Sequence, residues 1–167
     1  MNTELTYKEQ LEQLATTLSR FDYTCEILEL EGSNGIPVLF CDLPQERFVT
    51  FAFNPYPKEE IQYSKFLQIC SDLPLDVTPH NKGTLAEAIG FVNAHIPLGH
   101  FGLQEDKVLF RYVYSIPLTV TLEDSHCLET ISLAILVLEL FSGVLCDLAI
   151  GKLTVKEALE RIQQGNY

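Results

Sequence analysis

Residues 24–53 read TCEILELEGSNGIPVLFCDLPQERFVTFAF, and this stretch determines the fold that the sequence predicts. Its side chains alternate in character with a period of two, which is typical of β-strands. The pattern predicts three strands, at residues 24–30, 37–43 and 47–53. Gly32-Ser33-Asn34-Gly35 favours a hairpin turn between the first two, and Pro44-Gln45-Glu46 separates the second from the third. Because short loops join neighbouring strands in antiparallel fashion, the stretch predicts an antiparallel meander.

The chain beyond the meander is ambiguous between a helix and a strand over residues 57–72. Pro57-Lys58-Glu59-Glu60 looks like a helix start, and apolar residues follow it with helical spacing. Residues 66–77, however, contain Pro74 and continue in an extended pattern, so we predict a fourth strand there. Since proline cannot donate to a ladder, we expect this strand at an edge of the sheet. A second hairpin is predicted from strands at residues 100–104 and 108–116, with a turn at Glu105-Asp106-Lys107.

Four segments begin with the same helix-capping pattern, a threonine followed three residues later by an acid. The four patterns are Thr6…Glu9, Thr84…Glu87, Thr121…Asp124 and Thr154…Glu157. Pro97 ends the second helix, and Gly151 and Gly165 supply left-handed caps to the last two. The predicted order is therefore α-ββββ-α-ββ-α-α, an α+β fold in which helices flank an antiparallel sheet. We expect residues 1–167 to form a single domain.

The third helix contains a segment, residues 131–150, that is apolar enough to be mistaken for a membrane span. At roughly 100° per residue, one arc of about 140° collects its polar and small residues. They are Ser132, Glu139, Ser142, Gly143 and Asp147. A helix that lies across a sheet needs such a stripe, whereas a helix that faces lipid does not. We therefore predict that Glu139 and Asp147 face solvent. The residues predicted to form the centre of the core are Leu138, Phe141, Leu145 and Leu148.

The chain carries 23 acidic residues against 11 lysines and arginines, a formal net charge of −12. Such a surface repels nucleic-acid phosphates and anionic lipids, so we predict no nucleic-acid and no membrane partner. It favours a basic or amphipathic protein partner. The five cysteines are odd in number and widely spaced, which is typical of reduced thiols in a cytoplasmic protein. Residues 1–10 lack the apolar segment of a secretory signal.

The motifs in the sequence predict no catalytic, cofactor-binding or metal site. His95 and His100 are close enough in sequence to approach one metal ion, but no third ligand has a suitable spacing. Ser125-His126-Cys127 places a thiol beside an imidazole, yet adjacent helical residues point about 100° apart. The paired acids at residues 59–60, 105–106 and 123–124 fall at turns or helix starts, where they stay solvated.

An excess of apolar side chains is the feature that points to a binding surface. The strand at residues 47–53 carries bulk on both faces, with Phe48 on one face and Phe51 and Phe53 on the other. A sheet covered by helices on one face leaves its other face mostly polar, so this excess predicts an interface. The candidate interface residues are Phe48, Phe51, Phe53 and Phe91. The alternative is a fully enclosed sheet, with the first and fourth helices over its second face.

The order of elements resembles the type III secretion chaperone-like fold and, within it, the YbjN-like family. The local match is FVNAHIPLGHFGL at residues 91–103, followed by Glu105-Asp106 and the strand at residues 108–114. Members show a similar asparagine near the end of the second helix, then a small-residue junction and an acidic turn. The stretch at residues 66–74 also looks like cyanobacterial proteins of this kind. The resemblance covers residues 5–150 and leaves residues 151–167 as an added helix.

The resemblance implies an acidic dimer that binds polypeptides or acts as a regulatory partner, with no shared catalytic motif. We therefore predict a non-enzymatic, cytoplasmic, homodimeric protein-binding module that uses no cofactor. A protein or peptide segment would lie against sheet and helix surfaces or pair with an edge strand. One alternative is a small-ligand sensor or enzyme, with a pocket between the long helix and the sheet. Another is a structural subunit of a larger assembly.

Overall fold

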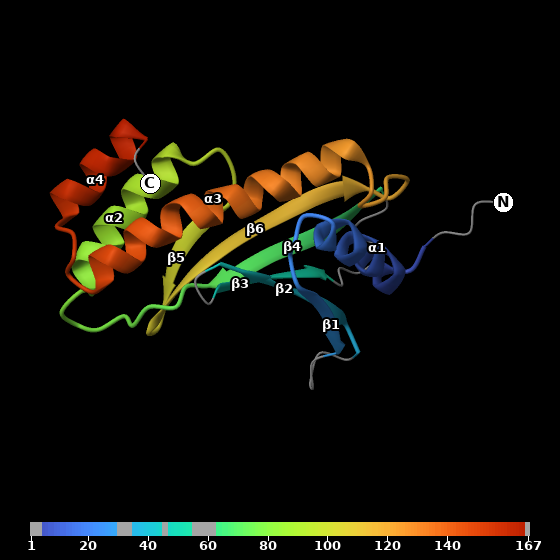
Figure 1. The fold of residues 1–167 in the computed structure, drawn as a ribbon, viewed down its shortest axis with the longest axis horizontal. Coiled ribbons are helices and arrows are strands. Elements are labelled where there is room, and N and C mark those ends of the chain that lie inside the picture. The colour runs from blue at the N-terminus through green and yellow to red at the C-terminus, as the bar shows by residue number, and fades with distance from the viewer. Residues whose placement is uncertain (1–4, 30–34, 45–46, 55–62, 166–167) are drawn as a thin grey trace. The chain divides into compact units, whose positions relative to one another are not determined.

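A computed structural model describes residues 5–29, 35–44, 47–54 and 63–165. Over these residues the chain has the predicted α+β fold, with the elements in the predicted order (Figure 1). The helices are α1 (Tyr7–Ser19), α2 (Lys82–His95), α3 (Ser125–Ala149) and α4 (Val155–Gln164). The strands are β1 (Cys25–Glu29), β2 (Pro37–Leu43), β3 (Arg47–Phe53), β4 (Ser64–Asp72), β5 (His100–Gln104) and β6 (Lys107–Pro117). The predicted turn residues 32–34 and 45–46, and the predicted helix start and acid pair within residues 57–60, lie outside the described part.

The strands form one six-stranded sheet in the order β1-β2-β3-β4-β6-β5. The strand predicted at residues 66–77 is confirmed over residues 66–72, but the prediction that it lies at an edge is wrong. β4 pairs with β3 on one side and lies next to β6 on the other, and directly after its last residue, Leu73 N donates to Val108 O of β6. Pro74 does not interrupt this ladder because the strand ends at Asp72. The edge strands are β1 and β5.

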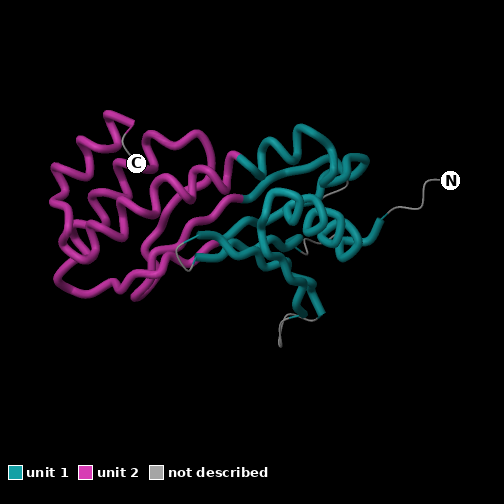
Figure 2. Tube along the Cα trace, viewed as in Figure 1, with its two compact units in different colours: residues 1–70, 113–132 teal, residues 71–112, 133–167 magenta. Residues whose placement is uncertain are grey.

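The chain divides into two compact units, each made of two segments (Figure 2). Unit 1 contains residues 1–70 and 113–132, and unit 2 contains residues 71–112 and 133–167. The long elements β6 and α3 each contribute residues to both units.

Unit 1 is built where α1 packs against β1, β2 and β3. The predicted capping box begins α1: the Thr6 hydroxyl accepts from the Glu9 amide, and the Glu9 carboxylate accepts from the Thr6 amide. The core contains buried residues of α1 and the inward-facing residues of the strands. They are Leu11, Leu14, Leu18, Leu39, Val49, Phe51, Phe53, Leu67 and Ile69. Lys65 of β4 is also buried, and its ammonium donates to Gln10 Oε1 at 2.5 Å and to Val120 O at 2.6 Å.

Unit 2 places α2 against β5 and α4. The added helix that the sequence predicts within residues 151–167 is α4, which buries Ala158 and Ile162 in this unit. The predicted capping box at Thr154 and Glu157 is confirmed, and so is the left-handed Gly165 at the end of α4. The chief apolar contributors from the other elements are Leu85, Ala88, Val92, Phe101, Phe110, Leu138, Phe141 and Leu145.

The two remaining helix starts differ from the predicted ones. α2 begins at Lys82 after Asn81, so Thr84 lies within the helix and its hydroxyl donates to Asn81 O. α3 begins at Ser125, because Asp124 accepts from the His126 amide and residues 121–124 form a turn. In both cases the residue before the first helical residue is not the predicted threonine: it is Asn81 before α2 and Asp124 before α3.

Candidate interaction surfaces

The buried face of α3 is the one that the sequence predicts. Leu138, Phe141, Leu145 and Leu148 are all buried. The opposite face carries the predicted polar stripe only in part: Ser132 is exposed, and Glu139 and Asp147 are half-buried. Ser142 is fully buried, and its hydroxyl donates to Glu139 O. Three leucines stand instead among the solvent-facing or half-buried residues of α3.

We name these leucines, together with Gly143 and Ile150, the α3 stripe. Its members are Leu133, Leu136, Leu140, Gly143 and Ile150. Leu133, Leu136 and Ile150 expose 38%, 47% and 65% of their surfaces, and Leu140 is half-buried. At about 100° per residue the five positions fall within an arc of about 100°. Their spacing is that of the apolar seam of a helix that packs against another helix. All five belong to unit 2.

Because Gly143 has no side chain, it leaves a depression in the α3 stripe between the larger side chains. A Cβ atom added at Gly143 meets no atom within 4 Å, so packing inside the chain does not require glycine there. Glycine in a helix interior costs roughly 0.5–1 kcal/mol relative to alanine. Close approach of a second backbone is one physical reason to accept that cost.

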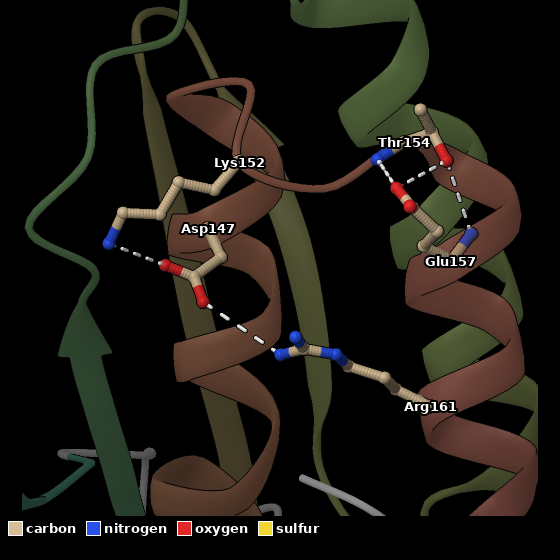
Figure 3. Close-up of polar contacts among 5 residues, drawn as sticks. All are labelled: Asp147, Lys152, Thr154, Glu157 and Arg161. Carbon is tan, nitrogen blue, oxygen red and sulfur yellow. Dashed lines mark hydrogen bonds and ion pairs between the residues drawn. The ribbon is translucent and has the colours of Figure 1, made fainter.

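The C-terminal end of the α3 stripe is fixed by ion pairs (Figure 3). Asp147 Oδ1 lies 3.2 Å from Lys152 Nζ, and Asp147 Oδ2 lies 4.0 Å from Arg161 Nη1 on α4. Both cations also lie near the carbonyl end of α3, where positive charge is favourable. These pairs are partly exposed, so they orient α4 beside α3 more than they stabilise it.

Unit 1 exposes a second apolar area, which we call the sheet patch: Leu28, Phe40, Phe48 and Ala52. These residues share the face of β1, β2 and β3 that is opposite α1, as the strand register places them. Phe48 exposes 37% of its surface and Leu28 39%, while Phe40 and Ala52 are half-buried. The rings of Phe40 and Phe48 lie with their centroids 6.1 Å apart.

The structure corrects two of the four predicted interface residues. Phe51 and Phe53 point to the α1 face of β3 and are buried in the core of unit 1, where Tyr7 stacks on Phe53 at 4.4 Å. They cannot contribute to an exposed surface, because α1 covers the face that strand alternation assigns to them. Phe48, on the other face, is exposed as predicted. Phe91 is half-buried, and the ring of His95 stacks on it at 4.1 Å.

The edge strand β5 is protected against pairing at its centre. Asn93 of α2 donates from Nδ2 to Phe101 O and accepts at Oδ1 from Phe101 N, both at 2.8 Å. The side-chain amide therefore occupies the two backbone groups that Phe101 would offer to a further strand. Covering an edge in this way is a common defence against unwanted pairing. Of the two edge strands, β1 is thus the better candidate for pairing with a peptide.

Unit 2 also has a hollow of about 390 Å³ between the end of α3 and residues 74–81. Asp76, Thr78, His80 and Ile150 line it and are exposed. Asn81, also in the lining, is already used: Nδ2 donates to Asp76 O and Ala149 O, and Oδ1 accepts from Thr78 N. The hollow therefore lies at the end of the long helix, and its polar groups mainly hold the loop to α3.

The side chains considered for catalysis do not form a reactive group. Cys127 is buried and turned inward as predicted, with Tyr114 Oη 3.7 Å from its sulfur, while His126 is exposed. His95 Nδ1 lies 2.8 Å from Phe91 O. Within residues 5–29, 35–44, 47–54 and 63–165, no group of three or more His, Cys, Asp or Glu side chains is placed to hold a metal ion.

Among the helices that the structure describes, α3 is long enough and apolar enough to cross a membrane, judged by length and composition alone. Within its most apolar 18-residue window, 56% of the residues are buried inside the protein. Some of the leucines that give the helix its membrane-like composition, such as Leu138, Leu145 and Leu148, thus belong to the protein core.

The α3 stripe is the surface that our sequence reasoning missed. The signal was present, since Leu133, Leu136 and Leu140 follow the i, i+3, i+7 spacing of an apolar seam. From the sequence, the polar arc is assigned to solvent and Leu138, Phe141, Leu145 and Leu148 to the core, which leaves these three leucines unassigned. Comparison with protein-family models, with curated proteins and with solved structures gives no match to this chain.

Proposed function

We propose that this protein is a non-enzymatic, cytoplasmic protein-binding module that acts as a homodimer joined through the α3 stripe. The observation that carries the proposal is the exposure of Leu133, Leu136 and Ile150 along one side of a helix. Burying a leucine or isoleucine side chain is worth roughly 1.5–3 kcal/mol. Three such side chains on each of two chains give a substantial driving force for association, against the entropic cost of pairing.

Gly143 supports a helix-to-helix mode of association. Because no atom of its own chain lies near the missing Cβ, a second helix can approach α3 closely at this point. In a two-fold dimer the same patch is used by both chains, so the α3 stripe of one copy would contact that of the other.

The sheet patch is the surface that we assign to a polypeptide partner, as in the type III secretion chaperone-like fold that the order of elements resembles. Leu28, Phe40 and Phe48 supply apolar anchors, and the neighbouring free edge of β1 offers backbone pairing. The net charge of −12 favours a basic or amphipathic segment.

The dimer is tested by sedimentation of wild type and of Leu136→Glu across micromolar concentrations. We expect wild type at twice 18.9 kDa and the variant near 18.9 kDa, because a buried glutamate in the seam is costly. Phe21→Glu is the matched control, since Phe21 is 69% exposed and lies outside the α3 stripe. A wild-type chain that sediments as a monomer throughout would refute the proposal.

A second test separates close helix contact from loose contact. Gly143→Ala raises helix propensity, so we expect the free energy of unfolding of the single chain to rise by roughly 0.5–1 kcal/mol. The added methyl group occupies the approach of the second helix, so we expect the dimer to weaken. The measurement pairs denaturation at low concentration with sedimentation. A variant that dimerises more tightly than wild type would show that Gly143 is not at the contact.

The hollow in unit 2 is the observation that favours the second candidate, a small-ligand sensor or enzyme. Its volume of about 390 Å³ is in the range of small-molecule sites. Native mass spectrometry of freshly purified protein, before and after His80→Ala, tests this role. A bound small molecule that His80→Ala removes would favour it over the binding module.

A further inference from the structure

Two of the five cysteines face each other across adjacent strands of unit 1. The register of β1 and β2 opposes Cys25 to Cys41. The neighbouring pair, Thr24 and Asp42, is joined by the bond from Asp42 N to Thr24 O. Since hydrogen-bonded and non-hydrogen-bonded pairs alternate, Cys25 and Cys41 form a non-hydrogen-bonded pair, with Cα atoms typically about 4.5 Å apart. Disulfides span Cα separations of roughly 4.4–6.8 Å.

The two thiols are not joined by a disulfide. None of the five cysteines forms a disulfide, and a hydrogen bond between the Cys25 and Cys41 thiols affects the pKa of both. The other cysteines have different surroundings. Cys70 opposes Thr50 and accepts from Gln68 Nε2, and Cys127 lies beside Tyr114 Oη. Among the register pairs of the described strands, Cys25 and Cys41 are the pair in which both members are cysteines.

We propose that Cys25 and Cys41 are a thiol–disulfide site, which low-molecular-weight disulfides oxidise to a reversible cross-strand bond. The Cys25 thiol loses its proton to solvent, its thiolate attacks one sulfur of R–S–S–R, and one R–S⁻ leaves. The Cys41 thiol then loses its proton, its thiolate attacks the Cys25 sulfur, and the second R–S⁻ leaves. Two protein thiols are oxidised, and the small disulfide is reduced to two thiols when the released thiolates take up those two protons.

The surroundings of the two sulfurs decide the order of attack. Burial raises the pKa of both thiols. The hydrogen bond lowers the pKa of Cys25 by less than burial raises it, and raises that of Cys41 further, as does the charge of Asp42. Cys25 is also only half-buried, whereas Cys41 is buried. Cys25 is therefore the thiol that meets an oxidant first, and the exchange is slow near neutral pH.

Oxidation would act on the edge of the sheet. β1 is an edge strand whose one strand neighbour is β2. A bond between Cys25 and Cys41 closes a loop of about 15 residues and fastens β1 in place, which limits the unfolded ensemble. Because the strand register already opposes the two cysteines, the folded state has little to rearrange.

The experiment exposes the reduced protein to oxidised glutathione at about pH 8.5, near the ordinary pKa of a thiol. Digestion after glutamates separates the two cysteines at Glu26, Glu29 and Glu31. We expect mass spectrometry to find one linked peptide pair containing Cys25 and Cys41, lost again on reduction. We also expect the melting temperature of the oxidised chain to rise by roughly 5–10 °C.

Three variants complete the test. Cys70→Ser is the matched control, since Cys70 is a half-buried strand cysteine outside the pair, and it should keep both the link and the shift. Cys25→Ser, and independently Cys41→Ala, should abolish both. Glutathione that stays attached to Cys25, a link between other cysteines, or a linked chain that melts below the reduced one would each overturn the proposal.

Discussion

Among the glycines that the structure describes, Gly99 is the one at which an added side chain would meet other atoms. Its φ is +70°, and an added Cβ would lie 2.6 Å from Phe110 Cζ. Phe110 is itself fully buried and packs on Phe101 with ring centroids 5.1 Å apart, so it has little freedom to move. Gly99 therefore permits the turn that leads from α2 into β5.

Gly99→Ala is expected to lower the free energy of unfolding by about 2–4 kcal/mol, from backbone strain plus overpacking. The matched control is Gly102→Ala, three residues on, where a Cβ meets no atom within 4 Å. We expect that change to stay within about 0.5 kcal/mol. Urea denaturation of both variants measures the difference. Equal stabilities would show that Phe110 yields to the added methyl group.

Residue-level burial could be predicted from the sequence where a face is continuous. The period of α3 identified Phe141 and Leu145 as core, because a buried helix face repeats at fixed spacing. The two faces of β3 could not be ranked, since Phe48 and Phe51 have the same chemistry. Only the position of α1 decides that Phe51 is covered and Phe48 is not.

At the scale of elements, the same threonine–acid pattern caps a helix at Thr6 and Thr154 but not at Thr84 or Thr121. At α2 and α3 the observed helix start lies only a few residues from the predicted one. Asn81 and Asp124 compete for the helix start, and tertiary packing decides which boundary is used. The position of β4 inside the sheet could not be predicted from local sequence signals, for a related reason. Its neighbour β6 follows it in the chain only after α2 and β5, so the two strands lie far apart in the sequence.

The capping difference predicts unequal effects of one substitution. Thr154→Ala should lower the free energy of unfolding by about 1 kcal/mol, because the Thr154 hydroxyl accepts from the Glu157 amide. Thr84→Ala, the matched control, should change it by less than about 0.5 kcal/mol. Thermal denaturation measures both. A loss at Thr84 as large as that at Thr154 would contradict the observed start of α2.

The contribution of the Thr154 cap also depends on pH. Hydrogen bonds from the backbone amide and hydroxyl of Thr154 hold the pKa of Glu157 below its ordinary value. A carboxyl whose pKa is lowered on folding stabilises the protein above its unfolded pKa, about 4.3 for glutamate. That stabilisation is lost as the pH falls through the folded pKa. The stability difference between wild type and Thr154→Ala should therefore narrow below about pH 4.

At the scale of the whole molecule, α3 explains how one segment can look like a membrane span and yet serve a folded core. Its buried face supplies Leu138, Phe141 and Leu145, and its exposed face supplies the α3 stripe. A helix that is apolar on nearly all sides needs partners on nearly all sides. The sheet and the other helices of the same chain provide some of these partners, and in our proposal a second copy of the protein provides the rest.

The charge of the molecule makes the proposed dimer distinguishable from a complex with a basic partner. Each copy carries a formal charge of −12, so two copies repel each other over long distances. Raising the ionic strength from about 0.01 M to about 0.1 M shortens the screening length from roughly 30 Å to roughly 10 Å. We therefore expect the dissociation constant of the homodimer, measured by sedimentation, to fall by about tenfold over this range. A basic peptide on the sheet patch should respond in the opposite sense, since salt screens an attraction there. A dimer that dissociates as salt is added would mean that charge pairs hold the copies together, and the apolar α3 stripe would no longer explain the association.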